Sequence, residues 1–352
     1  MRGPNRAVRG IAGLLVLAAF VVAALSACGD ADRHQRLAVL DLESRKTRVV
    51  SADDRTVDTA QWMPDSQRVL VLEGETPGGY FLSLRDIRSG EAVWELEGAM
   101  QTDRPLAAAP SPSGSEVAVL RDSFGAGERS ARIEFVDAAT GRVNRETAPW
   151  VTRLTAGATP LAAAVGWVSA DLLAVVSHHG AGFNDLLRLD ASTAAGLDWT
   201  ATEPSEVWLL TAAERGRLVV YAIGQPGPAQ FTLYNGDDAV SRAILTPISG
   251  NFSADFSPDG ERLVVASGER VYIFSFANWS AVEIAQAQTQ GISWGSNGRI
   301  AMAWGNEVFT IAEDGSERRT IASVGGGKTV RSPAWSPDGK KLAYVVEPKY
   351  RD

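Results

Sequence analysis

The chain of 352 residues has an ordinary globular composition, with 45% hydrophobic and 22% charged residues, and its formal net charge is −8. The first 27 residues hold three arginines and no acid, so their removal leaves 31 basic against 42 acidic side chains, a net charge of −11. A surface this acidic repels phosphate backbones, which argues against nucleic acid as a partner. The single cysteine excludes an internal disulfide and a CxxC redox or zinc pair.

Residues 1–27 have the pattern of a secretory signal peptide. Met1–Arg9 is short and basic, Ile11–Ala24 is almost entirely apolar, and small residues precede Cys28. The alternative is an uncleaved transmembrane helix, for which an apolar stretch of about 17 residues is at the lower limit of length. Both interpretations keep the arginines inside and place the rest of the chain outside the membrane.

The tetrad Leu25-Ser26-Ala27-Cys28 resembles the lipobox of bacterial lipoproteins. The resemblance implies that the Cys28 thiol receives a diacylglycerol, that cleavage leaves Cys28 as the first residue of the mature chain, and that palmitate is among its acyl groups. Two or more acyl chains on one residue hold a protein stably at a bilayer. We therefore expect the lipid bilayer as a partner through acylated Cys28, localisation at the outer face of the cell membrane, and a short tether over residues 28–36.

Beyond residue 36 the chain repeats a short apolar segment, a turn and a second apolar segment. The clearest copies, Phe256–Leu263 and Trp335–Leu342, both contain Ser-Pro-Asp-Gly. Ser, Pro, Asp and Gly suit the four successive positions of a tight turn that joins two antiparallel strands. Further copies, some of them weak, begin near Trp62, Pro110, Trp167, Thr211 and Trp294.

The spacing of these copies predicts an all-β chain folded as a seven-bladed β-propeller, with six or eight blades as alternatives. The copies recur about every 45 residues, which is the length of a four-stranded propeller blade. The chain ends on a hairpin, 333–346, and residues 37–42 and 47–51 predict two strands without a preceding hairpin. We expect these two halves to form one blade, which closes the ring and removes exposed sheet edges.

These residues resemble the TolB-like and WD40-like propeller families over residues 36–352. The chain has no Trp-Asp dipeptide and no catalytic motif of these families. The predicted organisation is a signal peptide over 1–27, the lipidated cysteine and tether over 28–36, and a propeller domain over 37–352.

Motifs that suggest other chemistry do not fit this setting. Gly291–Gly295 matches the nucleophile elbow of hydrolases, but it lies in a predicted hairpin strand and every histidine precedes it. Gly325–Thr329 resembles the end of a phosphate-binding loop, but Ala322 stands where the first glycine is needed. The pair His178-His179 is interpreted as part of a loop. We therefore expect no catalytic residue, no metal and no cofactor.

Propeller ligands usually meet the mouth of the central channel, where the loops lead into the innermost strands. The side chains predicted there are Asp58, Arg104, Asn251, Asp255 and Arg331. Two arginines among acids can bind a carboxylate or a peptide, or they can simply hydrogen-bond channel water. We place the repeat-position tryptophans in the core and Trp150, Trp199 and Trp279 in or near loops.

The leading functional hypothesis is a non-enzymatic, membrane-anchored propeller of the cell envelope that binds a protein or peptide. One alternative is a propeller enzyme, such as a metal-dependent hydrolase or a lactonase-like enzyme, which requires converging Asp, Glu or His at the channel mouth. The other is a glycan-binding module, which requires exposed tryptophans in one groove.

Overall fold

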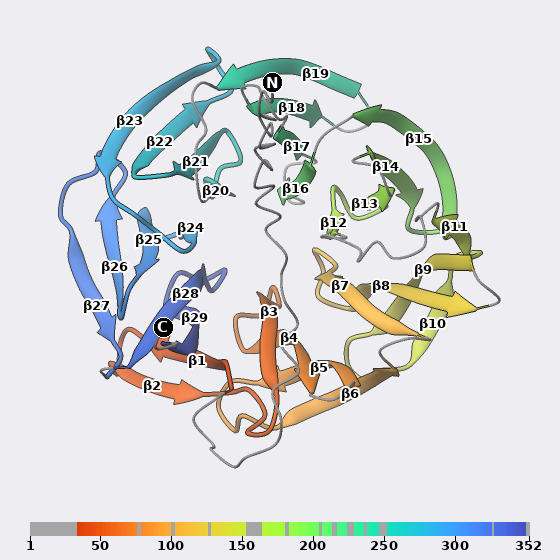
Figure 1. Ribbon diagram of the computed structural model, residues 1–352, viewed down its shortest axis with the longest axis horizontal. Coiled ribbons are helices and arrows are strands. Elements are labelled where there is room, and N and C mark those ends of the chain that lie inside the picture. The colour runs from red at the N-terminus through yellow and green to blue at the C-terminus, as the bar shows by residue number, and fades with distance from the viewer. Residues whose placement is uncertain are drawn as a thin grey trace, which may run out of the picture.

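Seven antiparallel sheets are arranged in a ring in the computed structural model (Figure 1). The structure describes residues 34–349 except for 76–78, 100–102, 126–127, 153–163, 180–182, 204–205, 213–216, 224–228, 236–237, 246–251 and 326. Six sheets have four strands and one has five, and the described residues form no helix. The predicted seven-bladed propeller is therefore confirmed.

Each of the first three blades begins with its innermost strand. Blade 1 consists of β3 (Thr56–Trp62), β4 (Arg68–Glu75), β5 (Gly79–Asp86) and β6 (Ala92–Ala99). Blade 2 consists of β7 (Arg104–Pro110), β8 (Glu116–Gly125), β9 (Glu128–Asp137), β10 (Val143–Glu146) and β11 (Trp150–Thr152). Blade 3 consists of β12 (Ala164–Trp167), β13 (Leu172–His179), β14 (Phe183–Asp190) and β15 (Ala195–Glu203).

The next three blades repeat this order. Blade 4 consists of β16 (Glu206–Ala212), β17 (Arg217–Ile223), β18 (Ala229–Asn235) and β19 (Asp238–Leu245). Blade 5 consists of β20 (Phe252–Phe256), β21 (Arg262–Ser267), β22 (Arg270–Ser275) and β23 (Ser280–Gln286). Blade 6 consists of β24 (Ile292–Trp294), β25 (Arg299–Trp304), β26 (Glu307–Ala312) and β27 (Arg319–Ser323).

Blade 7 is shared by the two ends of the propeller. It consists, from the inside outward, of β28 (Lys328–Trp335), β29 (Lys341–Pro348), β1 (Arg36–Asp41) and β2 (Lys46–Val49). The antiparallel register of β1 on β29 runs from Arg36 opposite Val346 to Asp41 opposite Lys341. The predicted closure of the ring by N- and C-terminal strands is confirmed.

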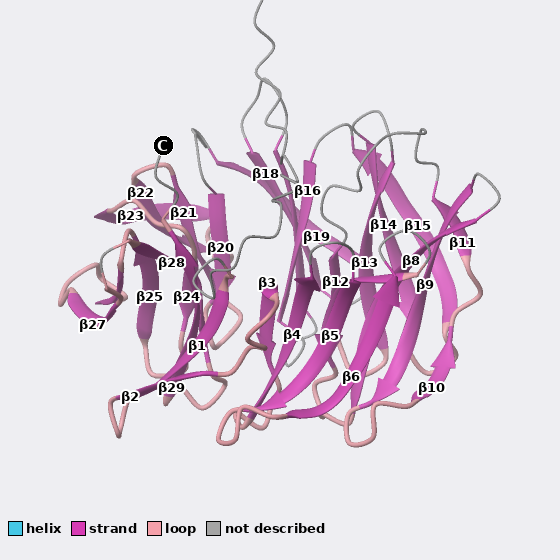
Figure 2. Ribbon diagram, turned by 60° about the horizontal axis from the view of Figure 1, so that its bottom comes forward, coloured by secondary structure: helices cyan, strands magenta, loops and turns pink. Residues whose placement is uncertain are grey.

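The ring has two faces that differ in their connections (Figure 2). We call top the face on which the chain enters each innermost strand, and bottom the face that carries the turns between the first and second and between the third and fourth strands of a blade. The innermost strands contact one another around the ring in the order β28, β3, β7, β12, β16, β20, β24 and back to β28. The channel is therefore lined by one strand from every blade.

The predicted Ser-Pro-Asp-Gly hairpins form as the turn chemistry requires. In blade 5 the amide of Gly260 donates to the carbonyl of Ser257 at 2.8 Å, and the amide of Arg262 donates to the Ser257 hydroxyl at 2.9 Å. Gly260 has a φ of 69°, which is costly for any residue with a Cβ. These bonds close the turn without help from the rest of the fold.

The aromatic residue before each turn packs between blades, as predicted. Trp62 and Trp167 are 7% and 3% exposed, and each indole nitrogen donates to a backbone carbonyl of the preceding blade, Ala334 at 2.9 Å and Ala109 at 3.0 Å. Trp294 and Trp335 are similarly buried. All four tryptophans add apolar area to a blade interface, whereas only Trp62 and Trp167 add a directional bond, because the buried indole nitrogens of Trp294 and Trp335 have no hydrogen-bond partner among the described residues.

Three local expectations need correction. His178 and His179 are the last two residues of strand β13 and do not form a loop. Trp199 lies inside strand β15 and not in or near a loop, whereas Trp150 is the first residue of β11, directly after a loop, as expected. Blade 2 has a fifth strand, β11, which pairs with β9 beyond the end of β10.

Candidate functional site

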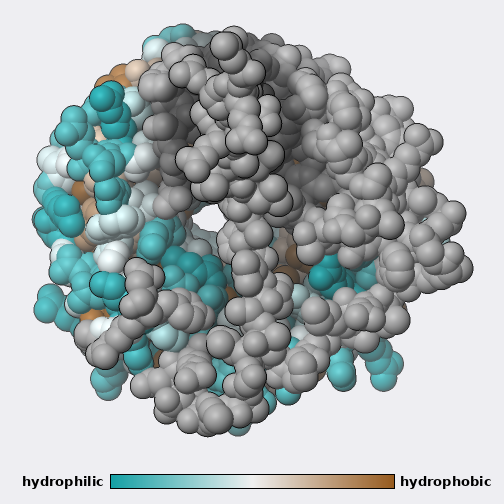
Figure 3. Space-filling model, in the orientation of Figure 1, coloured by the Kyte–Doolittle hydropathy of each residue, from teal (hydrophilic) through white to brown (hydrophobic). Residues whose placement is uncertain are grey.

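The channel opens at the centre of the top face (Figure 3). Along the side of the opening where the surface is coloured, hydrophilic residues lie beside it. Three of the predicted site residues lie in the top half of innermost strands that adjoin around the ring: Arg331 in β28, Asp58 in β3 and Arg104 in β7. The structure therefore brings Asp58, Arg104 and Arg331 together.

Asp58 projects from an irregularity in its strand. The pairing of β3 with β4 shifts between Val57 and Thr59, which leaves Asp58 as an extra residue without a partner on β4. Such bulges redirect a side chain and are common beside functional sites. Desolvation by the surrounding protein raises the pKa of Asp58, while the positive charges of Arg331 and Arg104 act to lower it.

Arg331 is held by contacts to three segments. Its Nε lies 3.2 Å from a Glu347 carboxylate oxygen, and its Nη2 donates to the Val57 carbonyl at 3.1 Å and to the Gln35 side-chain oxygen. Arg331 thereby joins β29, β3 and the segment that leads into β1. These contacts give it a structural role at the ring closure in addition to its place at the channel mouth.

Arg104 has more free hydrogen-bonding capacity. Its Nε lies 3.7 Å from a carboxylate oxygen of Asp122, and its guanidinium carbon lies 5.6 Å from the centre of the Tyr80 ring. The buried Nε of Arg104 has no hydrogen-bond partner. Because that Nε is buried, a carboxylate brought by a ligand would have to bind the Nη groups of Arg104, which make no hydrogen bond to a described residue.

The remaining predicted residues do not join this group. Asp255 lies near the bottom end of β20, where its carboxylate accepts the amide of Trp294 in the next blade at 2.8 Å and a hydrogen bond from Ser293. Burial raises the pKa of Asp255 to about 6. Asp255 thus connects two blades away from the mouth. Asn251 and Cys28 lie outside the described residues.

A pocket of about 260 Å³ lies on the top face at blade 7. Its lining includes His34, Arg36 and Lys328 as well as Asp53 and Glu347, so it carries both signs of charge. The His34 ring approaches the Thr56 hydroxyl at 3.4 Å, which places the end of the predicted tether beside β3.

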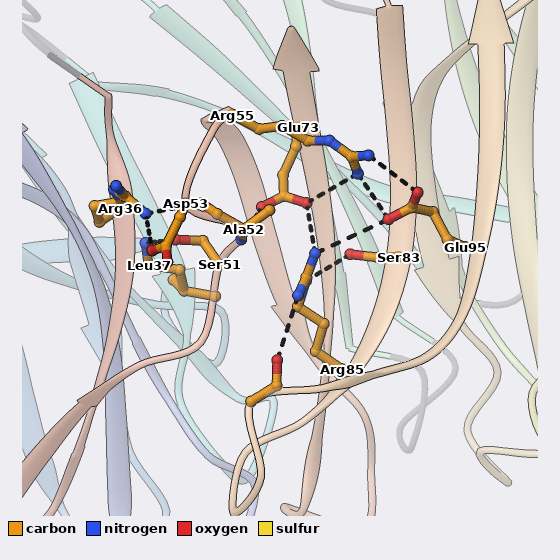
Figure 4. A network of polar contacts seen from close by, with 11 residues as sticks. Arg36, Leu37, Ser51, Ala52, Asp53, Arg55, Glu73, Ser83, Arg85 and Glu95 are labelled. Carbon is orange, nitrogen blue, oxygen red and sulfur yellow. Dashed lines mark hydrogen bonds and ion pairs between the residues drawn. The ribbon is translucent and has the colours of Figure 1, made fainter. Parts of the chain in front are cut away.

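A buried charge network that the sequence analysis did not identify supports this side of the ring (Figure 4). Glu73 is fully buried in β4 and accepts from the amide of Ala52 at 2.8 Å and from Arg85 at 3.2 Å. Arg55 pairs with Glu95 at 2.7 Å and stacks over the Phe81 ring. The network fixes the segment that joins blade 7 to blade 1.

Blade 2 has a similar buried network near the top end of its second strand, where an arginine takes the position that a glutamate has in blade 1. Arg121 of β8 stands where β4 has Glu73, and its Nε donates to Glu134 of β9 at 2.6 Å. Arg132 binds the other oxygen of Glu134 at 2.6 Å and approaches Asp103 at 3.2 Å. In both strands a charged residue follows four apolar ones, a signal that could have revealed these pairs from the sequence.

The two alternative functions require a metal-binding cluster of side chains or a groove of exposed tryptophans. Within those ranges no group of three or more His, Cys, Asp or Glu is arranged to hold a metal ion. Trp279 packs edge-on against Phe274 and Phe276 and belongs to the apolar core of blade 5, whereas Trp304 is 42% exposed at the end of β25. The side chains of Trp150 and Trp199 are outside the described set.

The described part of the chain does not include a helix that could cross a membrane.

No protein-family model matches the chain, and no curated protein matches its sequence. Solved structures do resemble it. U3-55K superposes with a TM-score of 0.60 at 10% sequence identity. The alignment covers 86% of this chain and 98% of the U3-55K chain. The β-propeller domain of Myceliophteria thermophila Cps50 (Swd1) is 10% identical over 82% of this chain and 96% of its own, with a TM-score of 0.54.

A chain of the Mitotic Checkpoint Complex is 15% identical over 84% of this chain and 96% of its own, also with a TM-score of 0.54. A TolB from Agrobacterium tumefaciens gives a looser superposition, with a TM-score of 0.45 at 16% identity over 91% of this chain and 100% of its own. The comparisons with TM-scores above 0.5 show that the fold of this chain is a β-propeller.

Proposed function

We propose that the chain is an exported, lipid-anchored protein of the bacterial cell envelope that binds a protein or peptide at the top face of its propeller without catalysing a reaction. The observation that carries the binding site is the convergence of Arg104, Asp58 and Arg331 from three adjoining blades on the channel mouth. The Arg104 guanidinium makes no hydrogen bond to a described residue and lies near the Asp58 carboxylate, a combination that suits a peptide, which offers both carboxylate and amide groups.

The anchoring part of the proposal rests on the sequence of residues 1–28. It is supported by the order of a basic segment, an apolar segment and Leu-Ser-Ala-Cys. The test is growth with an alkyne-labelled palmitate, followed by detection of labelled protein and separation of membranes. We expect labelling and membrane association of the wild type and loss of both in Cys28→Ser. Labelling that persists in Cys28→Ser contradicts the anchoring proposal.

The binding part is tested with charge-removing substitutions at the mouth. The full chain with an affinity tag is crosslinked in cells as wild type, as Asp58→Asn/Arg104→Gln, and as the control Glu317→Gln/Arg319→Gln. The control removes the same two charges from an exposed pair of blade 6. We expect a discrete crosslinked partner that disappears only in the mouth variant. A partner retained by the mouth variant, or lost equally in both variants, contradicts the proposed site.

A further inference from the structure

A second candidate surface lies on the bottom face, away from the channel mouth. A pocket of about 340 Å³ forms there between blade 7 and blade 1. Five cationic side chains and only two carboxylates line it; the cations are Lys46, Arg48, Arg88, Lys340 and Lys341. The pocket therefore carries the charge opposite to that of the chain as a whole.

Strand geometry explains how these cations come together. Lys46 and Arg48 alternate with exposed Thr47 along β2, so both point to the same face of that strand. That face also carries Val39, which lies opposite Arg48 on β1. The other cations come from turns on the bottom face: Arg88 from the turn after β5, and Lys340 from the turn before β29.

Most of these cations are not neutralised. Lys341 is the exception, because it is ion-paired and hydrogen-bonded: its Nζ lies 3.6 Å from an Asp338 carboxylate oxygen and donates to the Ser66 carbonyl at 3.2 Å. The other four, Lys46, Arg48, Arg88 and Lys340, are exposed, and none has a carboxylate within 4.0 Å among the described residues. Four positive charges thus surround one pocket without an ion-pair partner.

The carboxylates nearby are largely occupied by local turns. Asp41 accepts the amide and the hydroxyl of Ser44 at 2.7 and 2.8 Å, and these bonds lower the pKa of Asp41. Asp86 accepts the amides of Arg88 and Ser89 at 2.8 and 2.9 Å. Glu43 is the one lining carboxylate without such a bond to a described residue.

The arginines near the top face show the opposite arrangement. Arg55, Arg121, Arg132 and Arg331 each contact at least one carboxylate at 3.3 Å or less. Lysine is rare in this chain, with five in all, yet three of the five line the bottom pocket. Four exposed cations without an ion-pair partner among the described residues therefore lie around one pocket on the bottom face.

We propose that this pocket, which we call the basic pocket, binds an acidic peptide segment of a partner protein. Carboxylates of such a segment would pair with Lys46, Arg88 and Lys340, and buried Val39 and Ile87 offer an apolar floor for an aliphatic side chain between them. A combination of apolar contact and charge complementarity is typical of a specific peptide site.

A lipid surface fits the pocket less well. β1 begins at Arg36 on the top face, beside His34 and Gln35, and reaches the pocket only at Asp41. Because an extended strand rises about 3.4 Å per residue, the five residues from Arg36 to Asp41 place the pocket about 17 Å from the point where the chain enters the propeller. If the chain is anchored through Cys28 as proposed above, the basic pocket faces away from the membrane. The acidic-peptide assignment itself does not depend on that anchor.

The test uses the full chain in detergent and a fluorescein-labelled octapeptide of alternating Glu and Leu, with binding measured by fluorescence anisotropy. The pocket variant is Lys46→Gln/Arg88→Gln. The matched control is Lys349→Gln/Arg142→Gln, which removes one exposed lysine and one exposed arginine outside the pocket. Melting temperatures of both variants establish that they are folded.

We expect the pocket variant to bind the peptide about tenfold more weakly, the control to bind it within about twofold of wild type, and added salt to weaken binding. A peptide with Gln in place of Glu should not bind. Equal weakening in both variants, or no binding by the wild type at low salt, overturns the proposal. Displacement of the peptide by equimolar pyrophosphate or glycerol phosphate would identify a phosphate or lipid-headgroup site and overturn it as well. Because the mouth residues are intact in both variants, these outcomes are separate from those for the top face.

Discussion

At the scale of single residues, buried charge is what most distinguishes this propeller from a purely apolar stack of sheets. Glu73 pairs with Arg85 between β4 and β5 of blade 1, and Arg121 pairs with Glu134 between β8 and β9 of blade 2. Each ion is desolvated and therefore costly unless its partner is present.

Removal of one such charge should be strongly destabilising. We expect Glu73→Gln to lower the free energy of unfolding by about 3 kcal/mol, since Arg85 loses its buried counter-ion. The surface substitution Glu313→Gln, which removes the partner of Arg262, should cost less than about 1 kcal/mol. Urea unfolding followed by tryptophan fluorescence gives both values. A similar, small loss in the two variants would show that the buried network contributes little.

Asp255 should make stability depend on pH. Its pKa is about 6 in the folded protein, above the ordinary value of 3.8, so the folded state binds more protons than the unfolded state between these values. The stabilisation due to Asp255 is therefore complete at low pH and is lost as the pH rises through about 6. The unfolding free energy of the wild type relative to Asp255→Asn should fall by about 2.4 kcal/mol from pH 4 to pH 7. A difference that does not change with pH contradicts this account.

At the scale of elements, the bottom turns support one another as well as their own hairpins. The Ser296 hydroxyl donates to the Pro337 carbonyl, and the Asn297 side chain donates to the Gly339 carbonyl, both at 2.8 Å. The amide of Asp338 in turn donates to the Ser66 hydroxyl at 3.0 Å. Turns of blades 6, 7 and 1 are thus joined in a chain along the bottom face.

Two glycine-to-alanine substitutions distinguish the cost of backbone strain within a turn from the cost of crowding between adjacent turns. Gly298 and Gly339 have φ values of 72° and 66°, but a Cβ on Gly298 meets open space, whereas one on Gly339 would lie 2.7 Å from the Ser296 hydroxyl and 3.0 Å from the Asn297 amide nitrogen. We expect Gly298→Ala to cost about 1 kcal/mol of unfolding free energy from backbone strain alone. Gly339→Ala should cost at least about 2 kcal/mol, because the adjacent turn must also move. Equal costs in thermal unfolding would mean that the turns do not support one another.

Turns and apolar strands could be predicted from the sequence because their causes are local. The turn at Ser257 is specified by four adjacent residues, and Trp62 is marked as core by its place before such a turn. The bond from Asp255 to the next blade and the ring packing of Trp279, which does lie in a turn as expected, could not be predicted in this way. Asp255 depends on an amide of the next blade and Trp279 on the ring of Phe274, and both contacts arise only when the sheets pack.

At the scale of the whole molecule, β1 and β29 hold the ring together. Leu37, Val39 and Val345 belong to the same apolar core as Val69 and Val71 of blade 1, so the closing blade is continuous with its neighbour.

Hydrogen exchange should show this continuity. We expect the amides of β1 to exchange as slowly as those of β4, since opening of the closing blade requires unfolding of the ring. Exchange of the full chain, followed by mass spectrometry of its peptides, makes the comparison. Early exchange confined to β1 and β2 would show instead that the closing strands open on their own.

The most direct test of the central claim, that the top face binds a partner, is photocrosslinking from both faces of the full chain in cells. A photoreactive amino acid is placed at Asp54 or Asn306 on the top face and at Thr140 or Asp314 on the bottom face outside the basic pocket. The account predicts one partner adduct of the same mass from both top positions and none of that mass from the bottom positions. The same adduct from the bottom positions, or no adduct from the top, would contradict it.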